Sequence, residues 1–172
     1  MAVENYEATQ GDKTSRVYMK NLYVSGTPQF AGTFGVRYFI DYWFLGANLN
    51  AFGRNYIDVA PARRMEGVYD SVDPTIPEQW NTYQTMTTQE RIGSACTLDL
   101  SVGKIFYLRN RQSINFNLSV NNVLNKRDIR TGGYEQARVF GSDGTLVNPL
   151  LFPNKYYYMQ GINCFANISY RF

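Results

Sequence analysis

Histidine is absent from the 172 residues, which removes the side chain that most often acts as a general base or a metal ligand. No serine or cysteine lies beside a base in the sequence, so no catalytic constellation is recognisable. The sequence therefore predicts a protein that is not an enzyme and that binds no metal and no cofactor.

Long apolar runs and a dominant sign of charge are also missing. No stretch of about 18 apolar residues occurs, which excludes a transmembrane helix. Lysine and arginine number 17 against 14 acidic residues, the net charge is +3 and the basic residues are scattered, so we expect no nucleic-acid partner. Met1–Asn5 is acidic and is followed by polar residues, without the apolar stretch that a secretory signal peptide needs, so we expect no such signal.

Aromatic residues, by contrast, are abundant. They make up 16% of the chain, with 14 tyrosines and 11 phenylalanines, yet the mean hydropathy is −0.36. A polar average with so many aromatic residues is typical of strands in which one row of side chains meets lipid and the other meets water.

Alternation of apolar and polar residues is the main structural signal. It is perfect over Ser113–Asn121 and is broken only by Phe165 between Ile162 and Phe172. The polar rows consist mainly of small Asn, Ser, Gly and Thr, which suits the wet interior wall of a barrel. The pattern predicts six strands, near residues 17–24, 34–40, 43–52, 92–107, 112–122 and 162–172.

The lengths of the strands and connections favour an outer-membrane barrel. Four of the six segments reach the roughly 9–11 residues that a tilted membrane strand needs. Short turns are expected at Asp41–Tyr42 and Leu108–Arg111, whereas the connections 57–90 and 123–157 are long. Short turns are typical of the periplasmic side and long loops of the outside. This orientation places a girdle of aromatic residues at one edge: Tyr42, Trp43, Phe106, Tyr107, Tyr170 and Phe172.

Six strands are too few to close around a lumen, and an open sheet edge in lipid leaves backbone groups unsatisfied. The expected fold is therefore all-β, an antiparallel transmembrane β-barrel segment that is incomplete alone. We expect the rest of the barrel to come from elsewhere.

Several motifs resemble the C-terminal barrel portion of TonB-dependent outer-membrane receptors, and the resemblance covers nearly the whole of residues 1–172. The most specific are Asn121–Asn125 and the terminal Phe172; Tyr42–Phe44, Pro61–Arg64 and the ending Asn167–Phe172 also fit, as do Gly103–Lys104, Tyr56–Asp58, Thr131–Gln136 and Lys155–Tyr158.

This resemblance implies about the last six strands of a 22-stranded barrel in the bacterial outer membrane, without the plug domain. The receptor imports a nutrient with energy from TonB, which is contacted through the missing N-terminal part. The implied partners are outer-membrane lipid, the remainder of the barrel with its plug, and the barrel-assembly machinery. Iron chelates, cobalamin, oligosaccharides and peptides all remain open as ligands.

Two groups of residues are candidate functional sites. The alternate residues of the last strand resemble the signal read by the barrel-assembly machinery, although a lipid-facing row would look the same: Ala166, Ile168, Tyr170 and Phe172. Residues of the two long loops are candidate ligand contacts, with a solvated loop surface as the alternative: Arg63, Arg64, Trp80, Arg130 and Arg138.

The two cysteines, Cys96 and Cys164, are expected to stay unpaired. They lie on strands separated by the 112–122 strand, and two strand spacings of about 9.5 Å exceed the roughly 7 Å that a disulfide allows between Cα atoms. Both are expected to face lipid as small apolar side chains.

Two other protein classes compete with the barrel. A soluble, aromatic-rich β-sandwich that binds carbohydrate would have shorter strands and charged outer faces. A β-sheet hydrolase is disfavoured because histidine and an acid–base pair are missing.

Overall fold

The computed structural model describes residues 2–3, 6–10 and 13–172, and it is mostly antiparallel β-sheet. The chain divides into two compact units. We call the first the loop unit; it comprises the residues up to Pro28, Asn55–Ile92 and Arg130–Tyr157. We call the second the sheet unit; it comprises Gln29–Arg54, Gly93–Ile129 and Tyr158–Phe172.

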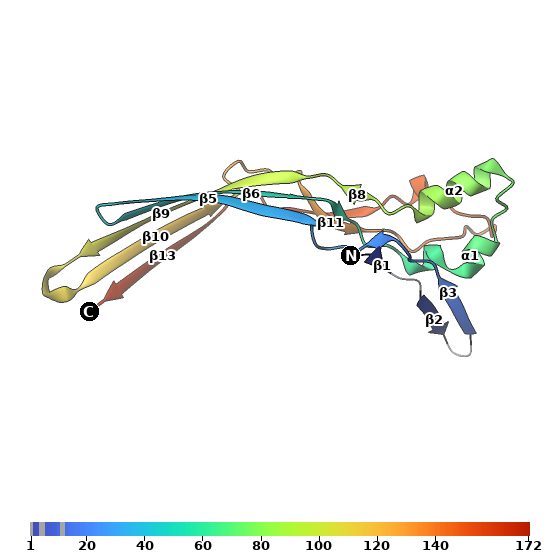
Figure 1. The fold of residues 1–172 in the computed structure, drawn as a ribbon, viewed down its shortest axis with the longest axis horizontal. Helices are drawn as coiled ribbons and strands as arrows, with labels where there is room; N and C mark the ends of the chain where they lie inside the picture. Colours follow the sequence, from blue (N-terminus) through green and yellow to red (C-terminus); the bar gives the residue numbers. More distant parts are fainter. Residues whose placement is uncertain (1, 4–5, 11–12) are drawn as a thin grey trace. The chain divides into compact units, whose positions relative to one another are not determined.

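The sheet unit is built on one antiparallel sheet of five strands, in the order β13-β10-β9-β6-β5 (Figure 1). Each of the five long strands pairs with the long strand that follows it in the chain, so the topology is a simple antiparallel meander. The strands are β5 (Phe30–Ile40), β6 (Trp43–Gly53), β9 (Ala95–Tyr107), β10 (Ser113–Asn121) and β13 (Asn163–Arg171).

Two tight turns join the strands in pairs. Asp41 and Tyr42 have φ angles of 44° and 65°, which is the left-handed geometry of a two-residue hairpin turn whose twist matches the flanking strands. Asn110 and Arg111 likewise have φ angles of 65° and 63° between β9 and β10. Both turns lie at the same end of the sheet as the C-terminus, and we call this the turn end.

Five of the six predicted strands form this sheet, and their lengths of 9 to 13 residues confirm the prediction of long strands. The sixth prediction, residues 17–24, is wrong. A turn interrupts it, because Asn21 has a φ of 67° and the N–H of Leu22 donates to the carbonyl of Met19 at 3.3 Å. Its two halves belong to different small sheets.

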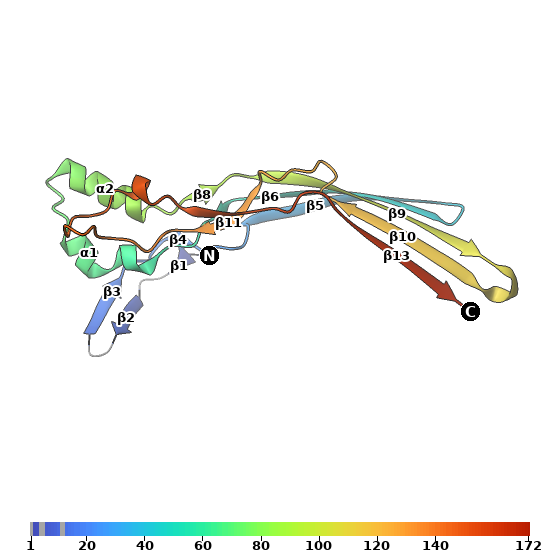
Figure 2. The same ribbon diagram turned by 180° about the vertical axis from the view of Figure 1, so that it is seen from behind.

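The loop unit contains short elements, so the long connections are more ordered than the sequence suggested (Figure 2). Proline stands at the start of three of the helices, where its missing N–H has no helical partner to lose. The elements are β1 (Ala2–Val3), β2 (Tyr6–Gln10), β3 (Lys13–Val17), β4 (Leu22–Tyr23), β7 (Asn55–Tyr56), the 3₁₀ helix η1 (Pro61–Arg64), α1 (Glu66–Asp70), α2 (Pro77–Thr87), β8 (Arg91–Ile92), β11 (Arg130–Tyr134) and β12 (Lys155–Tyr158). Two further 3₁₀ turns are η2 (Arg109–Arg111) in the sheet unit and η3 (Pro149–Leu151) in the loop unit.

The buried apolar core lies in the loop unit. Among the described residues, Ile129 is the one buried hydrophobic residue that belongs to the sheet unit. The five-stranded sheet is therefore held by its backbone ladder and polar side chains without an apolar core of its own. The core of the loop unit consists of Val17, Met19, Ile57, Ala60, Val68, Val72, Met86 and Ile92.

A buried ion pair lies within the loop unit. The Arg64 guanidinium donates from Nη1 to Glu135 Oε2 at 2.6 Å and from Nη2 to Oε1 at 2.8 Å, and both side chains are 2% exposed. Nη2 also donates to the carbonyl of Thr87 at 2.6 Å, and the N–H of Ala60 donates to Glu135 Oε2 at 2.9 Å. These bonds join η1, the end of α2 and the residue that follows β11.

We expect Glu135→Gln to destabilise the loop unit by about 3–5 kcal/mol, because the Arg64 charge stays buried without its counter-charge. Urea unfolding followed by Trp80 fluorescence in a Trp43→Phe background measures this, since these are the two tryptophans of the chain. Glu78→Gln, at an exposed position in the first turn of α2, is the matched control and should cost less than about 1 kcal/mol. Equal shifts in the two variants would contradict the role given to the ion pair.

Candidate membrane-facing surface and loop residues

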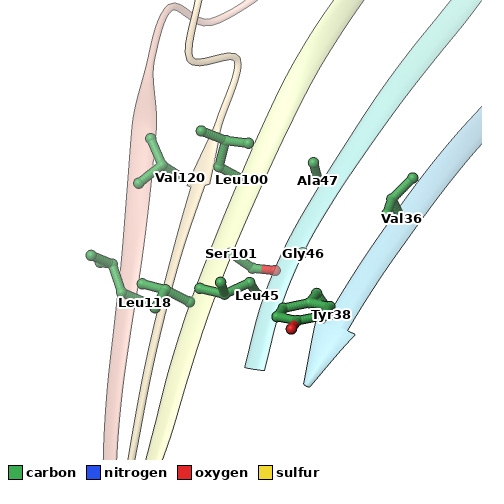
Figure 3. A pocket seen from close by; sticks show the side chains of 10 residues that line it. Val36, Tyr38, Leu45, Gly46, Ala47, Leu100, Ser101, Leu118 and Val120 are labelled. Carbon is green, nitrogen blue, oxygen red and sulfur yellow. The ribbon is translucent and has the colours of Figure 1, made fainter. Parts of the chain in front are cut away.

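One face of the five-stranded sheet carries apolar side chains almost without interruption, and we call it the apolar face. The pairing register places apolar residues opposite one another from strand to strand. In Figure 3 one such row runs across the strands through Val120, Leu100, Ala47 and Val36. The face consists of Phe30, Phe34, Val36, Tyr38, Ile40, Trp43, Leu45, Ala47, Leu49, Ala51, Cys96, Leu98, Leu100, Val102, Lys104, Phe106, Ile114, Phe116, Leu118, Val120, Cys164, Ala166, Ile168, Tyr170 and Phe172, with Gly32 among them.

Large side chains of this face are exposed. Phe34 and Ile168 are each 70% exposed, and Val36 is 55% exposed. The small side chain of Ala47 leaves a shallow hollow of about 520 Å³, bordered by Leu45 and Leu100 (Figure 3). A contiguous exposed apolar patch that spans five strands is typical of a surface that contacts lipid or another protein.

The opposite face, here called the polar face, is mainly a hydrogen-bonded polar surface. The pairing register also places five large apolar residues on it: Phe39, Phe44, Phe52, Ile105 and Phe165. Asn50 accepts a bond from Thr33 at 2.9 Å and donates to Asp99 Oδ2 at 2.6 Å, which links β5, β6 and β9. The N–H of Asn122 donates to Asp99 Oδ1 at 2.8 Å. The carboxylate of Asp99 is thus satisfied by two donors although it lies in the middle of the sheet.

Glycines on the polar face make room for these side chains. Gly46 stands opposite Ser101, and a Cβ at Gly46 would lie 2.4 Å from the Ser101 hydroxyl oxygen. Gly103 has the same relation to Asn117, at 2.5 Å. The small residues of the polar rows therefore let each longer polar side chain lie across its neighbouring strand.

Aromatic residues gather at the turn end, as the sequence predicted. Tyr42 and Tyr107 contact each other edge to face with ring centroids 5.0 Å apart. Tyr170 and Phe172 lie 6.2 Å apart at the end of β13. Trp43 begins β6 at the same end.

Lys104 is the one charged residue of the apolar face. Its Nζ lies 4.9 Å from the centroid of the Trp43 ring and 5.9 Å from that of Phe106, and it donates to the Asp41 carbonyl at 2.8 Å. The lysine thus keeps its apolar stem on the face and its charge at the turn, which is the behaviour called snorkelling.

The Asn121–Asn125 motif fixes the far end of β10. The Asn122 side chain donates to the carbonyls of Lys126 at 2.9 Å and Gln160 at 3.0 Å, and Asn125 Oδ1 accepts from the N–H of Ile162 at 3.0 Å. Asn122 and Asn125 have φ angles of 50° and 51°, which asparagine tolerates better than most residues. The motif therefore binds the start of β13 into register beside β10.

The candidate assembly signal lies on an edge strand. Ala166, Ile168 and Tyr170 stand opposite Leu118, Phe116 and Ile114, and every residue of β13 is exposed. The terminal Phe172 is 95% exposed. Among the described strands β13 pairs with β10 alone and β5 with β6 alone, so the sheet has two open edges.

Both cysteines are free, as predicted. Cys96 lies on β9 and Cys164 on β13, with β10 between them. The strand order therefore confirms the reason for their separation.

Arg63 and Arg64 are buried, which corrects the expectation that they lie on an exposed loop. Arg64 is 1% exposed and is occupied by the ion pair with Glu135. Arg63 is 3% exposed, and its Nε has no hydrogen-bond partner among the described residues. Desolvation lowers the pKa of Arg63, the nearby Glu135 opposes that shift, and Arg64 adds to it.

The other three loop candidates lie apart in the loop unit. Trp80 is half-buried on α2 and stacks on Tyr83 with centroids 5.7 Å apart. Arg130 is exposed on β11, where it lies over the Tyr156 ring. Arg138 is exposed over the Phe152 ring at 4.4 Å. Trp80, Arg130 and Arg138 thus contact different aromatic rings, and no contact in the described part of the chain joins all five candidates directly.

Sequence reasoning missed a cluster around Glu90. Its carboxylate accepts from the Tyr156 hydroxyl at 2.8 and 3.0 Å and from Asn154 Nδ2 at 2.8 Å, and it pairs with Arg130 at 3.5 Å. The partners of Glu90 lie 40 to 66 residues away in the chain, and no local pattern marks such a pair.

Comparison of the chain with protein-family models, with curated proteins and with solved structures found no match. Neither helix in the described part of the chain has the length and apolarity needed to cross a membrane. Within residues 2–3, 6–10 and 13–172, no three His, Cys, Asp or Glu side chains are grouped to hold a metal ion.

We expect Asp99→Ala to destabilise the sheet unit by about 2 kcal/mol or more, because two charge-assisted hydrogen bonds are lost and their donors are left unpaired. Unfolding followed by Trp43 fluorescence in a Trp80→Phe background measures this. Asp128→Ala is the control, since Asp128 is an exposed aspartate of the same unit. A control that is as destabilised as Asp99→Ala would show that the polar ladder contributes nothing specific.

Proposed function

We propose that the chain is a wall segment of an outer-membrane β-barrel, with the apolar face against lipid and the polar face toward the interior. The exposed apolar face of five long strands is the observation that carries this proposal. We further propose that the barrel is a TonB-dependent receptor for a nutrient, on the motifs that resemble that family.

The energetics of the apolar face support contact with lipid. Removal of a large apolar side chain from water contributes about 1.5–3 kcal/mol, and the face holds many such residues in an exposed position. Strands of 9 to 13 residues have the length that a tilted membrane strand needs. The polar face, with its small hydrogen-bonded side chains, suits a water-filled interior.

The residues at the turn end support one orientation of the sheet in the membrane. Trp43, Phe106 and Tyr170 there suit the headgroup level of the bilayer, and the Lys104 amine would reach the same level. The two short turns then lie on the periplasmic side, and the long connections that form the loop unit lie outside.

The two unpaired edges of the sheet, β5 and β13, are the positions at which strands from the rest of the barrel pair in this proposal. An unpaired backbone edge in lipid leaves each N–H and C=O unsatisfied at several kcal/mol. We therefore infer that other strands pair with β5 and β13. The exposed row of β13 is also the segment we assign to recognition by the barrel-assembly machinery: Ala166, Ile168, Tyr170 and Phe172.

Tryptophan quenching tests the proposal directly. After reconstitution into vesicles of brominated phosphatidylcholine, Trp43 in the Trp80→Phe variant should be quenched, because it lies on the apolar face. Trp80 in the Trp43→Phe variant should be quenched much less and should respond to aqueous acrylamide. A soluble sandwich would cover the apolar face with a second sheet, and Trp43 would then show no quenching by bromolipid.

Neighbouring residues on opposite faces provide a second test. Leu100→Arg places a charge on the lipid side in the middle of the sheet and should cost about 2–4 kcal/mol. Ser101→Arg changes the next residue, on the polar face, and should be tolerated. The fraction of protein in outer membranes that migrates faster before boiling measures the folded form. Equal loss in both variants would exclude this assignment of faces.

A further inference from the structure

A pocket of about 660 Å³ with a mixed apolar and polar lining lies within the loop unit. Its size falls in the range of small-molecule sites, which is about 300–1,000 Å³. The lining residues come from η1, α2, η3 and the segments before β8 and around β12: Arg63, Asn81, Gln84, Thr85, Met86, Thr88, Glu90, Glu135, Pro149, Leu150, Pro153, Asn154 and Tyr156.

Arg63 is the feature of this pocket that lacks a structural explanation. Its side chain lines the pocket although the residue is 3% exposed, and its Nε, like that of Arg64, has no hydrogen-bond partner among the described residues. Arg63 differs from Arg64 because it forms no salt bridge in the described part of the chain. A buried cation without full hydrogen bonding is costly, and native structures rarely keep such a group without a reason. Desolvation, which lowers the pKa of Arg63, is the physical sign of that cost.

The charged side chains at the pocket include one positive charge that no carboxylate of the described residues balances. Three charged residues line it: Arg63, Glu90 and Glu135. Glu135 is neutralised by Arg64 at 2.6 Å, and Glu90 pairs with Arg130 at 3.5 Å. Arg63 forms no salt bridge of its own among the described residues, although the desolvation that lowers its pKa is opposed by the nearby charge of Glu135. The three arginines and the two glutamates thus have a net charge of +1, which a single carboxylate on a ligand would balance.

Neutral polar groups complete the lining. Asn81 and Gln84 are one turn apart on α2 and offer side-chain amides. The hydroxyls of Thr85 and Thr88 are already used, since they donate to the carbonyls of Asn81 and Gln84 at 2.8 and 2.7 Å. Amides beside an unpaired guanidinium suit a molecule that carries hydroxyl groups as well as an anion.

We propose that this pocket binds a small hydroxylated molecule with a single carboxylate, which accepts hydrogen bonds from the Arg63 guanidinium. Guanidinium and carboxylate match in geometry, and the pairing supplies the counter-charge that the Arg63 side chain lacks among the described residues. All lining residues belong to the loop unit, so this inference does not rest on contact of the sheet with lipid.

Isothermal titration with matched probes tests the proposal. D-galacturonate should bind the protein saturably, and D-galactose, the same ring without the carboxylate, should bind about tenfold more weakly or worse. Acetate tests the carboxylate alone, and inorganic phosphate tests a second source of oxyanion. Binding of phosphate that is tighter than that of galacturonate would overturn the assignment to a single carboxylate, as would absence of binding by both galacturonate and acetate.

Substitution of arginine residues tests whether Arg63 is the residue that binds the carboxylate. Arg63→Met should weaken galacturonate binding by about tenfold or more, whereas Arg138→Met, which removes an exposed arginine outside the pocket, should leave it unchanged. Arg63→Met should also be at least as stable as the parent, because a desolvated charge is replaced by an apolar side chain. Urea unfolding followed by Trp80 fluorescence checks that the variant is folded. Galacturonate affinity that is equal in Arg63→Met and in the parent would overturn the proposal.

The titration and the lipid quenching can fail separately. Quenching of Trp43 reports on the sheet unit, and galacturonate binding reports on the loop unit. Loss of quenching with intact binding would reject the barrel wall and keep the pocket, and the reverse result would do the opposite.

Discussion

A single register of apolar and polar alternation, kept across five strands, is the constraint on which the sheet depends. Because side chains alternate with period two, a slip of one residue in any strand would move its apolar row to the polar face. The left-handed turn residues at Asp41 and Asn110 fix two of the pairings. The hydrogen bonds of Asn122 and Asn125 fix a third, between β10 and β13. These local devices account for three of the four pairings, and the hydrogen bond from Asn50 to Asp99 joins the fourth pair, β6 and β9.

The two units are stabilised in different ways. The loop unit has a conventional apolar core and a buried ion pair between Arg64 and Glu135. The sheet unit has a backbone ladder and a polar network around Asp99, but its apolar residues are exposed. An apolar surface of this kind is unfavourable in water and favourable in lipid. The exposed apolar face therefore destabilises the sheet unit in water and stabilises it in lipid.

Two consecutive arginines are buried in the loop unit, but they differ in their ionic partners. Arg64 is held by Glu135, Thr87 and the nearby backbone, so its burial contributes to the fold. Arg63 is buried beside it and forms no salt bridge in the described part of the chain. Buried groups that break the rules of polar satisfaction are expected at functional positions, because function is what retains them against their cost.

The sequence by itself determined the long strands, their two faces, the turn positions and the separation of Cys96 from Cys164, because alternation and turn residues are local properties. It failed at residues 17–24, where weak alternation was outweighed by the left-handed turn at Asn21. Only the tertiary structure decided that Arg63 and Arg64 are buried and that Arg64 meets Glu135, 71 residues away. The helices and short strands that bring these residues together interact over long separations, and no periodic pattern in the sequence records which loop residues will be enclosed.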